Sequence, residues 1–408
     1  MTPAAGGAWV AGIPGVGAAP LPRGGVLGIP ENVWDPAVRR VIGWGGAWRA
    51  YLDRLRPPLT IGHDRSLGHL VRSRMGAKVL DRLVAPVTSG VYSARPDDID
   101  VDAAAPGLNA ALTRTGSLSG AVAELRAGVP ATPGSAVAGL EGGMTRLVDA
   151  LAVRLGELGV EVRTGTAVER IRRVDGVWEV ALATADERED TPDSAPDGPA
   201  DGDEVVHADI VVVATPEAEA RRLLRPLLPA LGDAPAAAPV VEIVTLVVDA
   251  PELDAPPRGT GVLTVPHAFE AKALTHATAK WAWIGERSGA GVHVVRVSFG
   301  AQDEEPATAA LDDDDAAALA LAQASEMLGV ALAPDRLRGA HRERYEQSQP
   351  ASVIGRAELV AGARTAIRGL AGLGAVGAWL SGTGLAQVVP DAIAEADRLR
   401  HGALWRDR

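Results

Sequence analysis

The spacing of apolar residues predicts a helical first third of the chain. Between residues 31 and 127, apolar positions recur every three or four residues, as one face of an amphipathic helix requires. Residues 34–55 are expected to form a helix that ends at the following proline pair. Residues 66–92 are expected to form two shorter helices that stop near Pro86.

The next part of the chain changes from a helical to an alternating pattern. Residues 139–159 contain a glycine turn and then an amphipathic helix, with Leu147, Leu151 and Leu155 on one stripe. Residues 160–182 alternate between apolar and polar positions, which is typical of two strands joined by a turn.

An acidic segment and several apolar runs follow. Residues 183–204 are acidic, rich in proline and glycine, and lack apolar anchors, so they are predicted to be a disordered, solvated loop; an acidic partner-binding segment is the alternative. Residues 207–216, HADIVVVATP, are typical of a strand buried on both faces of a parallel sheet. Strand-like runs dominate residues 240–300, and residues 312–328 predict a helix whose acidic first turn suits the helix dipole.

Residues 372–392, GLGAVGAWLSGTGLAQVVPDA, allow several interpretations. Their G-x-G-x-x-G would bind a dinucleotide only if a helix began at the third glycine, and the residues after Gly377 are not expected to start one. A membrane span is disfavoured by the many glycines and by Pro390. The remaining interpretation is a strand over residues 375–380, a turn, and a helix from Pro390 whose N-terminus faces a cofactor. A plain strand-helix connection is the alternative.

Composition excludes several function classes. A net charge of -12 disfavours nucleic-acid binding, which needs a basic surface. The absence of cysteine excludes disulfides, thiolate nucleophiles and cysteine-ligated metals, and the eight histidines show no metal-ligand spacing, so no metal is predicted. The first residues lack the basic region of a signal peptide, which favours a cytoplasmic protein.

Several motifs, in order along the chain, resemble those of the flavin-dependent porphyrinogen oxidases of haem biosynthesis, within the amine oxidase-like superfamily. The most specific is VLDRLVAPVTSGVYSARPDDIDV (residues 79–101), which is similar to the family's G-V-Y-x-x-x-P-x-x-L. Further matches lie at residues 8–30, 139–151, 273–281, 344–360 and 372–392.

The resemblance implies an α/β fold: a Rossmann-like FAD/NAD(P)-binding flavoprotein fold with an interleaved α+β substrate-binding domain. The family's first strand, G-x-G-x-x-G and helix are not found, so the fold is expected to be incomplete at its N-terminus. The predicted parts are residues 1–138 (substrate-binding, mainly helical), 139–239 (FAD-binding, middle), 240–350 (substrate-binding, β-sheet) and 351–408 (FAD-binding, C-terminal).

The function implied is oxidation of coproporphyrinogen III or protoporphyrinogen IX to the porphyrin, in three flavin-mediated two-electron steps with oxygen as acceptor. The protein's task would be to hold the substrate beside the FAD. Two alternatives stay open, a flavin amine oxidase and a flavin-free remnant or porphyrin-binding protein. The absence of the family's first strand and glycine turn supports the flavin-free remnant or porphyrin-binding protein. The sequence does not determine which porphyrinogen is the substrate.

The cofactor-binding residues implied by the resemblance lie in three motifs. Val168 would hold the adenine through its backbone, and Thr215 and Pro216 would follow the strand that lines the cofactor. Where the family has G-V-G before a proline, this chain has AQVV, a bulkier turn. Three residues would lie near the isoalloxazine: Gly382, Val388 and Val389.

The resemblance also indicates substrate residues. Lys280 is the candidate for a catalytic role, with a solvent-facing strand lysine as the alternative. Val91 and Tyr92 would line the substrate cavity, and arginines would bind the propionates bidentately. The arginine candidates are Arg82 and Arg95, and Trp281 would either stack on substrate or pack in the core.

The sequence leaves open whether the protein forms a homodimer and whether it makes peripheral contact with a membrane. The helix that carries Trp44 and Trp48 could lie on a membrane surface, although packing of both tryptophans into the substrate-binding domain is the favoured interpretation.

Overall fold

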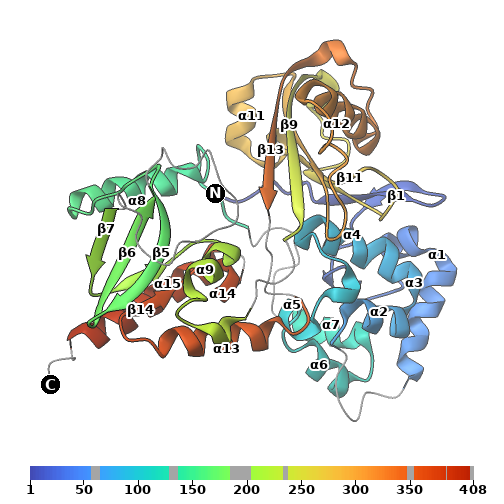
Figure 1. Ribbon diagram of the computed structural model, residues 1–408. Coiled ribbons are helices and arrows are strands. Elements are labelled where there is room, and N and C mark those ends of the chain that lie inside the picture. Colours follow the sequence, from blue (N-terminus) through green and yellow to red (C-terminus); the bar gives the residue numbers. More distant parts are fainter. Residues whose placement is uncertain are drawn as a thin grey trace. The chain divides into compact units, whose positions relative to one another are not determined.

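The computed structural model describes residues 1–56, 65–127, 137–183, 204–232, 238–346, 353–382 and 384–404 (Figure 1). Its contacts divide the chain into two compact units. The first unit comprises residues 1–149, 238–347 and 352–354. The second unit comprises residues 150–237, 348–351 and 355–408.

A seven-stranded sheet organises the first unit. Its strand order is β13-β9-β12-β11-β10-β1-β2, and every neighbouring pair is antiparallel except β1 and β10, which are parallel. The strands are β1 (Ala8–Ile13), β2 (Gly17–Pro20), β9 (Val240–Asp249), β10 (Gly261–Thr264), β11 (Ala271–His276), β12 (Val292–Phe299) and β13 (Leu337–Glu346).

One face of this sheet is covered by helix α12 (Asp313–Leu328), as Figure 1 shows. The Asp312 side chain caps the helix by accepting the backbone N–H of Asp315 at 2.9 Å. Buried alanines and leucines of α12 pack on alternate residues of β9 and β12, such as Val244, Leu246 and Val295. The predicted helix over residues 312–328 is confirmed.

The predicted helical region forms the rest of the first unit around its own core. Helix α1 (Pro36–Tyr51) is interrupted at Gly43, whose φ of 71° lies outside the helical range. Trp44 and Trp48 of this helix are 64% and 57% exposed, so the favoured expectation that both pack into the interior is wrong. The other elements are β3 (Gly25–Val26), β4 (Ile29–Pro30), the 3-10 turns η1 (Leu52–Leu55) and η4 (Pro96–Asp98), and helices α2 (Leu67–Met75), α5 (Val101–Ala104), α6 (Leu108–Thr115) and α7 (Leu118–Arg126).

The helical run does not stop near Pro86, contrary to the prediction. It continues through α3 (Ala77–Val79), the π-helical η2 (Leu80–Val84), α4 (Ala85–Val87) and the π-helical η3 (Thr88–Tyr92). Proline has no N–H for a regular helical hydrogen bond, and here wider π turns lie on both sides of it. π turns are common at functional sites, and η3 carries part of the most specific motif.

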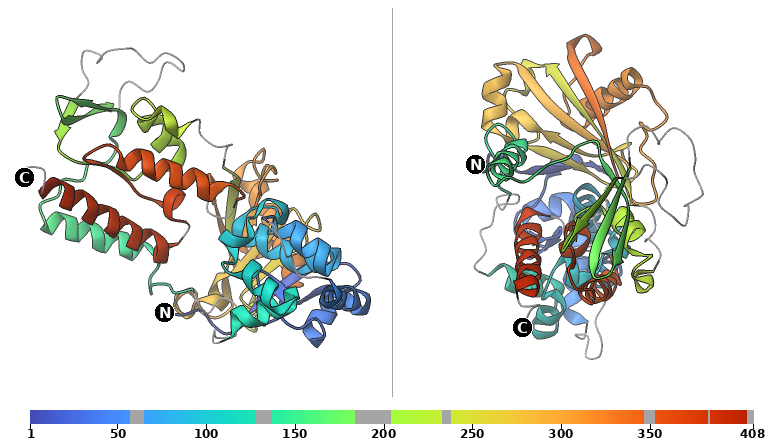
Figure 2. Two further views of the ribbon diagram at one scale, coloured as in Figure 1. Left: turned by 90° about the horizontal axis from the view of Figure 1, so that it is seen from below. Right: turned by 60° about the vertical axis from the view of Figure 1, so that its left-hand side comes forward.

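The second unit contains two small sheets and several helices. Strands β5 (Ala167–Val174), β6 (Val177–Ala183) and β7 (Glu204–Ala208) form the antiparallel sheet drawn in green in Figure 2. Strand β8 (Val211–Val213) pairs in parallel with β14 (Leu373–Ala375). The helices are α9 (Glu217–Leu224), the 3-10 turn η6 (Pro229–Leu231), α13 (Arg356–Arg368), α14 (Ala378–Ser381) and α15 (Leu385–Leu404). Helix α8 (Thr145–Glu157) crosses the boundary between the units in sequence and confirms the amphipathic helix expected there.

Two predictions for residues 183–216 need correction. Ala183 ends β6 and Glu204 begins β7, so both ends of the predicted acidic loop belong to strands, and residues 184–203 lie outside the described part of the chain. The apolar run after it is not one strand buried on both faces: the chain ends β7 at Ala208 and starts β8 at Val211, and Val212 is 46% exposed.

The glycine-rich stretch also differs from its prediction. Its strand is β14, earlier than expected, and a helical turn, α14, follows Gly377. Helix α15 begins at Leu385 and contains Pro390 in its second turn. The reason is that Gly377 and Gly382 have φ values of 124° and 98°, which end each element, while the carbonyl of Gly384 accepts the N–H groups of Gln387 and Val388 and starts α15 early. No described helix combines the length and hydropathy needed to cross a bilayer.

Candidate functional site

Three of the six predicted cofactor residues follow the two strands of the parallel pair in the second unit. Thr215 and Pro216 directly follow β8, and Pro216 is the N-cap of α9. Gly382 follows β14 by way of α14. Because β8 and β14 are parallel, their carboxyl ends meet at the same edge, which is where ligands bind in open α/β sheets.

The buried polar atoms at this edge that lack a partner in the part of the chain that the structure describes include two uncharged donors. They are the hydroxyl of Thr215 and the indole N–H of Trp379. Buried polar groups are normally hydrogen-bonded, so an orphaned donor beside a ligand edge indicates a missing polar partner. The backbone around Gly384, at φ 146°, leaves open the space that a Cβ would occupy. These features fit a polar ligand, such as a flavin nucleotide, that would supply hydrogen-bond acceptors at this edge.

A buried ion-pair network holds the helices around this edge. The Glu217 carboxylate accepts from Arg221 at 2.9 Å and from Arg356 at 2.5 Å, and Arg356 also donates to the carbonyl of Trp379 at 3.1 Å. All three charged side chains are at most 6% exposed. The network therefore joins α9, α13 and α14. It was not predicted, since Glu217 and Arg356 are far apart in the sequence.

The other three cofactor candidates also belong to the second unit: Val168 lies in β5, and Val388 and Val389 lie in α15. The carbonyl of Val168, on β5, accepts from Arg222 of α9 at 2.8 Å. Val388 and Val389 lie in the first turns of α15; Val388 is half-buried, and its N–H donates to Gly384 at 2.9 Å. Val389 is 46% exposed. The structure thus places Gly382 directly after α14, and Val388 and Val389 in the first turns of α15.

The predicted substrate residues Val91 and Tyr92 lie in the π-helical η3 of the first unit. Val91 is exposed, whereas Tyr92 packs against the helical core, and burial raises the pKa of its hydroxyl. The next residue, Ser93, is buried and left-handed at φ 54°. Lys272 of β11 donates to the Ser93 hydroxyl at 2.7 Å, and burial lowers the pKa of Lys272 to about 8 against the opposing effect of Glu304. Lys272 was not predicted, because only the tertiary fold brings it to this turn.

Both arginine candidates are engaged with protein groups. Arg82 donates to the carbonyl of Val41 at 3.1 Å, which ties η2 to α1. Arg95 is more exposed and forms ion pairs with Asp98 at 3.0 Å and Asp303 at 3.1 Å, which raise its pKa. A substrate carboxylate at Arg95 would therefore have to compete with two acidic side chains.

Lys280 and Trp281 lie after the predicted strand rather than in it. Strand β11 ends at His276, and Lys280 is the last residue of the short helix α10 (Ala277–Lys280). Burial, with a smaller effect of Arg296, lowers the pKa of Lys280, whose Nζ lies 5.8 Å from the Trp281 ring centre. The indole of Trp281 packs closely over Gly139. Lys280 is thus half-buried, not a solvent-facing strand lysine.

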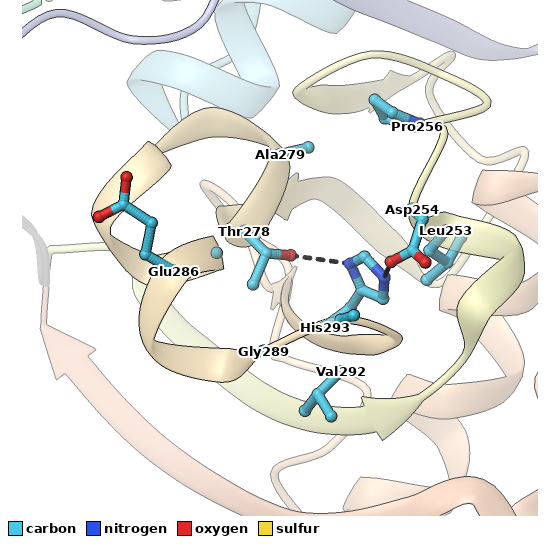
Figure 3. A pocket seen from close by; sticks show the side chains of 11 residues that line it. Leu253, Asp254, Pro256, Thr278, Ala279, Glu286, Gly289, Val292 and His293 are labelled. Carbon is cyan, nitrogen blue, oxygen red and sulfur yellow. Dashed lines mark hydrogen bonds and ion pairs between the residues drawn. The ribbon is translucent and has the colours of Figure 1, made fainter.

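A cavity of about 420 Å³ lies beside these residues in the first unit (Figure 3). His293 of β12 points into it, between the carboxylate of Asp254 at 3.1 Å and the hydroxyl of Thr278 at 3.1 Å. The Nδ1 atom of His293 also lies 3.1 Å from Nε2 of the fully buried His276. The elements around the cavity include the 3-10 turn η7 (Pro251–Leu253), α10, α11 (Ala282–Ser288) and β12. The residues that line the cavity are Leu253, Asp254, Pro256, Thr278, Ala279, Gly285, Glu286, Gly289, Ala290, Val292 and His293.

The hydrogen-bond roles in this cluster are set by Asp254. When the Asp254 carboxylate accepts from the Nε2–H of neutral His293, Nδ1 of His293 is left as an acceptor for the Nε2–H of His276 and the hydroxyl of Thr278. Burial, with His293 alongside, lowers the pKa of His276 to about 4. No signal in the sequence indicated this pair, because the spacing of the histidines matches no ligand motif. The fold brings His276 and His293 together from neighbouring strands.

Comparison with known proteins agrees with the motifs. The sequence model of the flavin containing amine oxidoreductase family matches residues 18–399. The chain is 28% identical to coproporphyrinogen III oxidase of Propionibacterium freudenreichii over 94% of this chain and 74% of that protein, and 28% identical to that of Mycobacterium bovis over 93% and 75%. A proposed protoporphyrinogen oxidase from Exiguobacterium sp. 255-15 has a similar fold, with a TM-score of 0.75 and 22% identity over 98% of this chain and 80% of that chain.

Proposed function

Because the chain belongs to the flavin-containing amine oxidoreductase family, we propose that it is an FAD-dependent porphyrinogen oxidase of haem biosynthesis. As a member of that family it is an oxidoreductase with a flavin cofactor. The proposal of a porphyrinogen as substrate rests on the relatives named coproporphyrinogen III oxidase, which match over nearly the whole of this chain. The observation that carries the proposed cofactor site is the orphaned pair of Thr215 and Trp379 at the carboxyl ends of β8 and β14.

We assign the cofactor to this edge of the second unit. The Thr215 hydroxyl and the Trp379 indole N–H would donate to polar groups of the FAD. The glycine turn at Gly382 and the start of α15 at Val388 and Val389 would border its ring, and the backbone of Val168 would border the adenine. Once bound, the flavin supplies the oxidising chemistry by accepting two electrons from the substrate.

The chain's own residues would then orient the macrocycle and handle charge and protons. Val91 and Tyr92 offer an apolar and aromatic surface, and Arg82 and Arg95 offer guanidinium groups for propionate carboxylates. At Arg95, a bound propionate would take the place of Asp98 or Asp303. Burial lowers the pKa of Lys280, so its ammonium group would release a proton more readily than that of an exposed lysine.

The proposed substrate is coproporphyrinogen III, and oxygen is the proposed electron acceptor. Six electrons leave the macrocycle in three two-electron steps, and each step would transfer its electrons onward to oxygen. Protoporphyrinogen IX is the second substrate to test, because the structural neighbour is described by that name.

The visible spectrum of the purified chain tests the proposal first. The protein is incubated with excess FAD, desalted, and then given coproporphyrinogen III while porphyrin fluorescence and oxygen uptake are recorded. We expect a retained flavin absorption and porphyrin formation with oxygen uptake. Retained flavin with turnover of putrescine but not of a porphyrinogen would support the amine oxidase alternative instead. A folded chain that binds coproporphyrin but retains no flavin would support the flavin-free alternative.

A further inference from the structure

Helix α8, labelled in Figure 1, carries an apolar stripe that no other described element covers. No residue of this 13-residue helix is buried in the described part of the chain. By contrast, α12 buries seven residues in the first unit. An isolated helix of this length is only marginally stable in water, and packing of its amphipathic face normally stabilises it. The exposed stripe of α8 therefore indicates a surface that packs against a partner.

The stripe follows the spacing of a coiled-coil seam. Five apolar residues recur at alternating intervals of four and three residues, from one residue before α8 to one residue after it. They are Met144, Val148, Leu151, Leu155 and Leu158, and they are 38–63% exposed. The backbone N–H of Leu158 donates to the carbonyl of Arg154 at 3.2 Å, so the helical pattern reaches the last of them. This spacing places all five side chains along one line of contact with a second helix.

The charges of this segment favour a second copy of the same chain as the partner. Residues 144–158 contain two basic and two acidic side chains and are neutral, whereas the whole chain carries a net charge of -12. Two copies can therefore meet at this stripe with little mutual repulsion. Antiparallel helices would set Arg146 of one copy level with Glu157 of the other, and parallel helices would set each charge level with the same charge. Arg154 would likewise lie level with Asp149.

We propose that the chain forms a homodimer in which α8 packs antiparallel against α8 of a second copy. Leu151 would face its own counterpart at the centre, and Val148 would face Leu155 on either side of it. Met144 would face Leu158 at the two ends. Removal of these apolar side chains from water supplies the driving force. This inference does not depend on the flavin or on the reaction.

The mass of the full chain in solution, measured by light scattering after size-exclusion chromatography, tests the proposal. We expect twice the mass of the chain at micromolar protein concentration. Val148→Glu places a charge in the seam and should give a monomer. Val153→Glu is the matched control and should remain a dimer, because Val153 is equally exposed but lies on the opposite side of α8 from the seam. Circular dichroism checks that both variants remain folded.

Single cysteines can report which residues meet, because the chain contains no cysteine of its own. On oxidation, Leu151→Cys should give a disulfide-linked dimer. Met144→Cys should not, because antiparallel packing separates the two copies of residue 144 by about 21 Å along the helix axis. A monomeric wild type, or a dimer that Val148→Glu leaves intact or that both glutamate variants dissociate equally, would overturn the proposal. A disulfide between two copies of Met144→Cys would show parallel helices and would overturn it as well.

Discussion

His276 illustrates how one buried side chain can make the stability of the first unit depend on pH. Its pKa is about 4 in the folded chain, whereas an unfolded histidine titrates near 6.5. Below pH 6.5 the unfolded chain therefore binds a proton that the folded chain does not. The folded state loses stability as the pH falls from about 6.5 to about 4, by an amount on the order of 3 kcal/mol.

The first prediction follows from that shift. His276→Gln keeps an N–H that can donate to His293 and cannot titrate, so its melting temperature should change less between pH 7 and pH 5 than that of the wild type. His341→Gln is the control, because the His341 side chain is exposed and lies 3.2 Å from the Glu343 carboxylate. Melting followed by circular dichroism measures both. An unaltered acid sensitivity in His276→Gln would show that another group is responsible.

Thr215 carries the second prediction. In the absence of cofactor its shielded hydroxyl has no partner among the described residues, so Thr215→Val should leave the melting temperature unchanged or slightly raised. With FAD present, the same variant loses a donor, and we expect the dissociation constant of FAD to rise about tenfold, the value of one hydrogen bond.

Thr308→Val is the matched control for Thr215→Val. The Thr308 hydroxyl is fully buried and donates to the Glu242 carboxylate at 2.6 Å. This variant should lower the melting temperature and leave the affinity for FAD unchanged, as measured by flavin fluorescence quenching. If both threonine variants behave alike, Thr215 has no specific role toward the cofactor.

At the scale of elements, the network of Glu217, Arg221 and Arg356 joins three helices of the second unit. Arg356→Met removes one partner and leaves the buried carboxylate with fewer donors, which typically costs about 3–5 kcal/mol. We expect a lower midpoint of urea unfolding, followed by far-ultraviolet circular dichroism. Arg364→Met is the control, because its partner Asp391 is 20% exposed and keeps access to water. An equal loss in both variants would mean that burial of the network contributes little.

Local sequence signals predicted some elements well and others poorly, for physical reasons. The helix α12 has an aspartate cap and a continuous helical period, so its limits were clear from residues 312–328 alone. The glycine-rich stretch has few side chains to define a period, and backbone angles at Gly377, Gly382 and Gly384 decided the outcome. The helix through Pro86 was missed because π turns have no signal in apolar spacing.

The same distinction applies to the candidate site. Thr215, Pro216 and Gly382 were located from motifs, and the structure brings the segments that carry them to one sheet edge. Arg356 lay within a recognised motif, but its partner Glu217 precedes it by 139 residues, and no local pattern could pair them. His276 and His293 likewise meet only because β11 and β12 are neighbours. Motifs could therefore indicate candidate residues, whereas the pairing of their side chains depended on the fold.

At the scale of the whole molecule, the seven-stranded sheet is assembled from two distant parts of the chain. Strand β1 pairs in parallel with β10, with Ala8 opposite Gly261, and the sheet continues to β13 at residues 337–346. The residues between β1 and β10 include the whole of the second unit's first segment and the whole helical region.

This pairing has a consequence for biosynthesis. The hairpin of β1 and β2 leaves the ribosome long before β10 exists, and at about 5–20 residues per second the delay for a segment of this length is on the order of 10–50 seconds. During that time the edge of β1 that β10 later covers is available to other strands, including those of neighbouring nascent chains. Translation speed and chaperone supply should therefore influence the yield of folded protein.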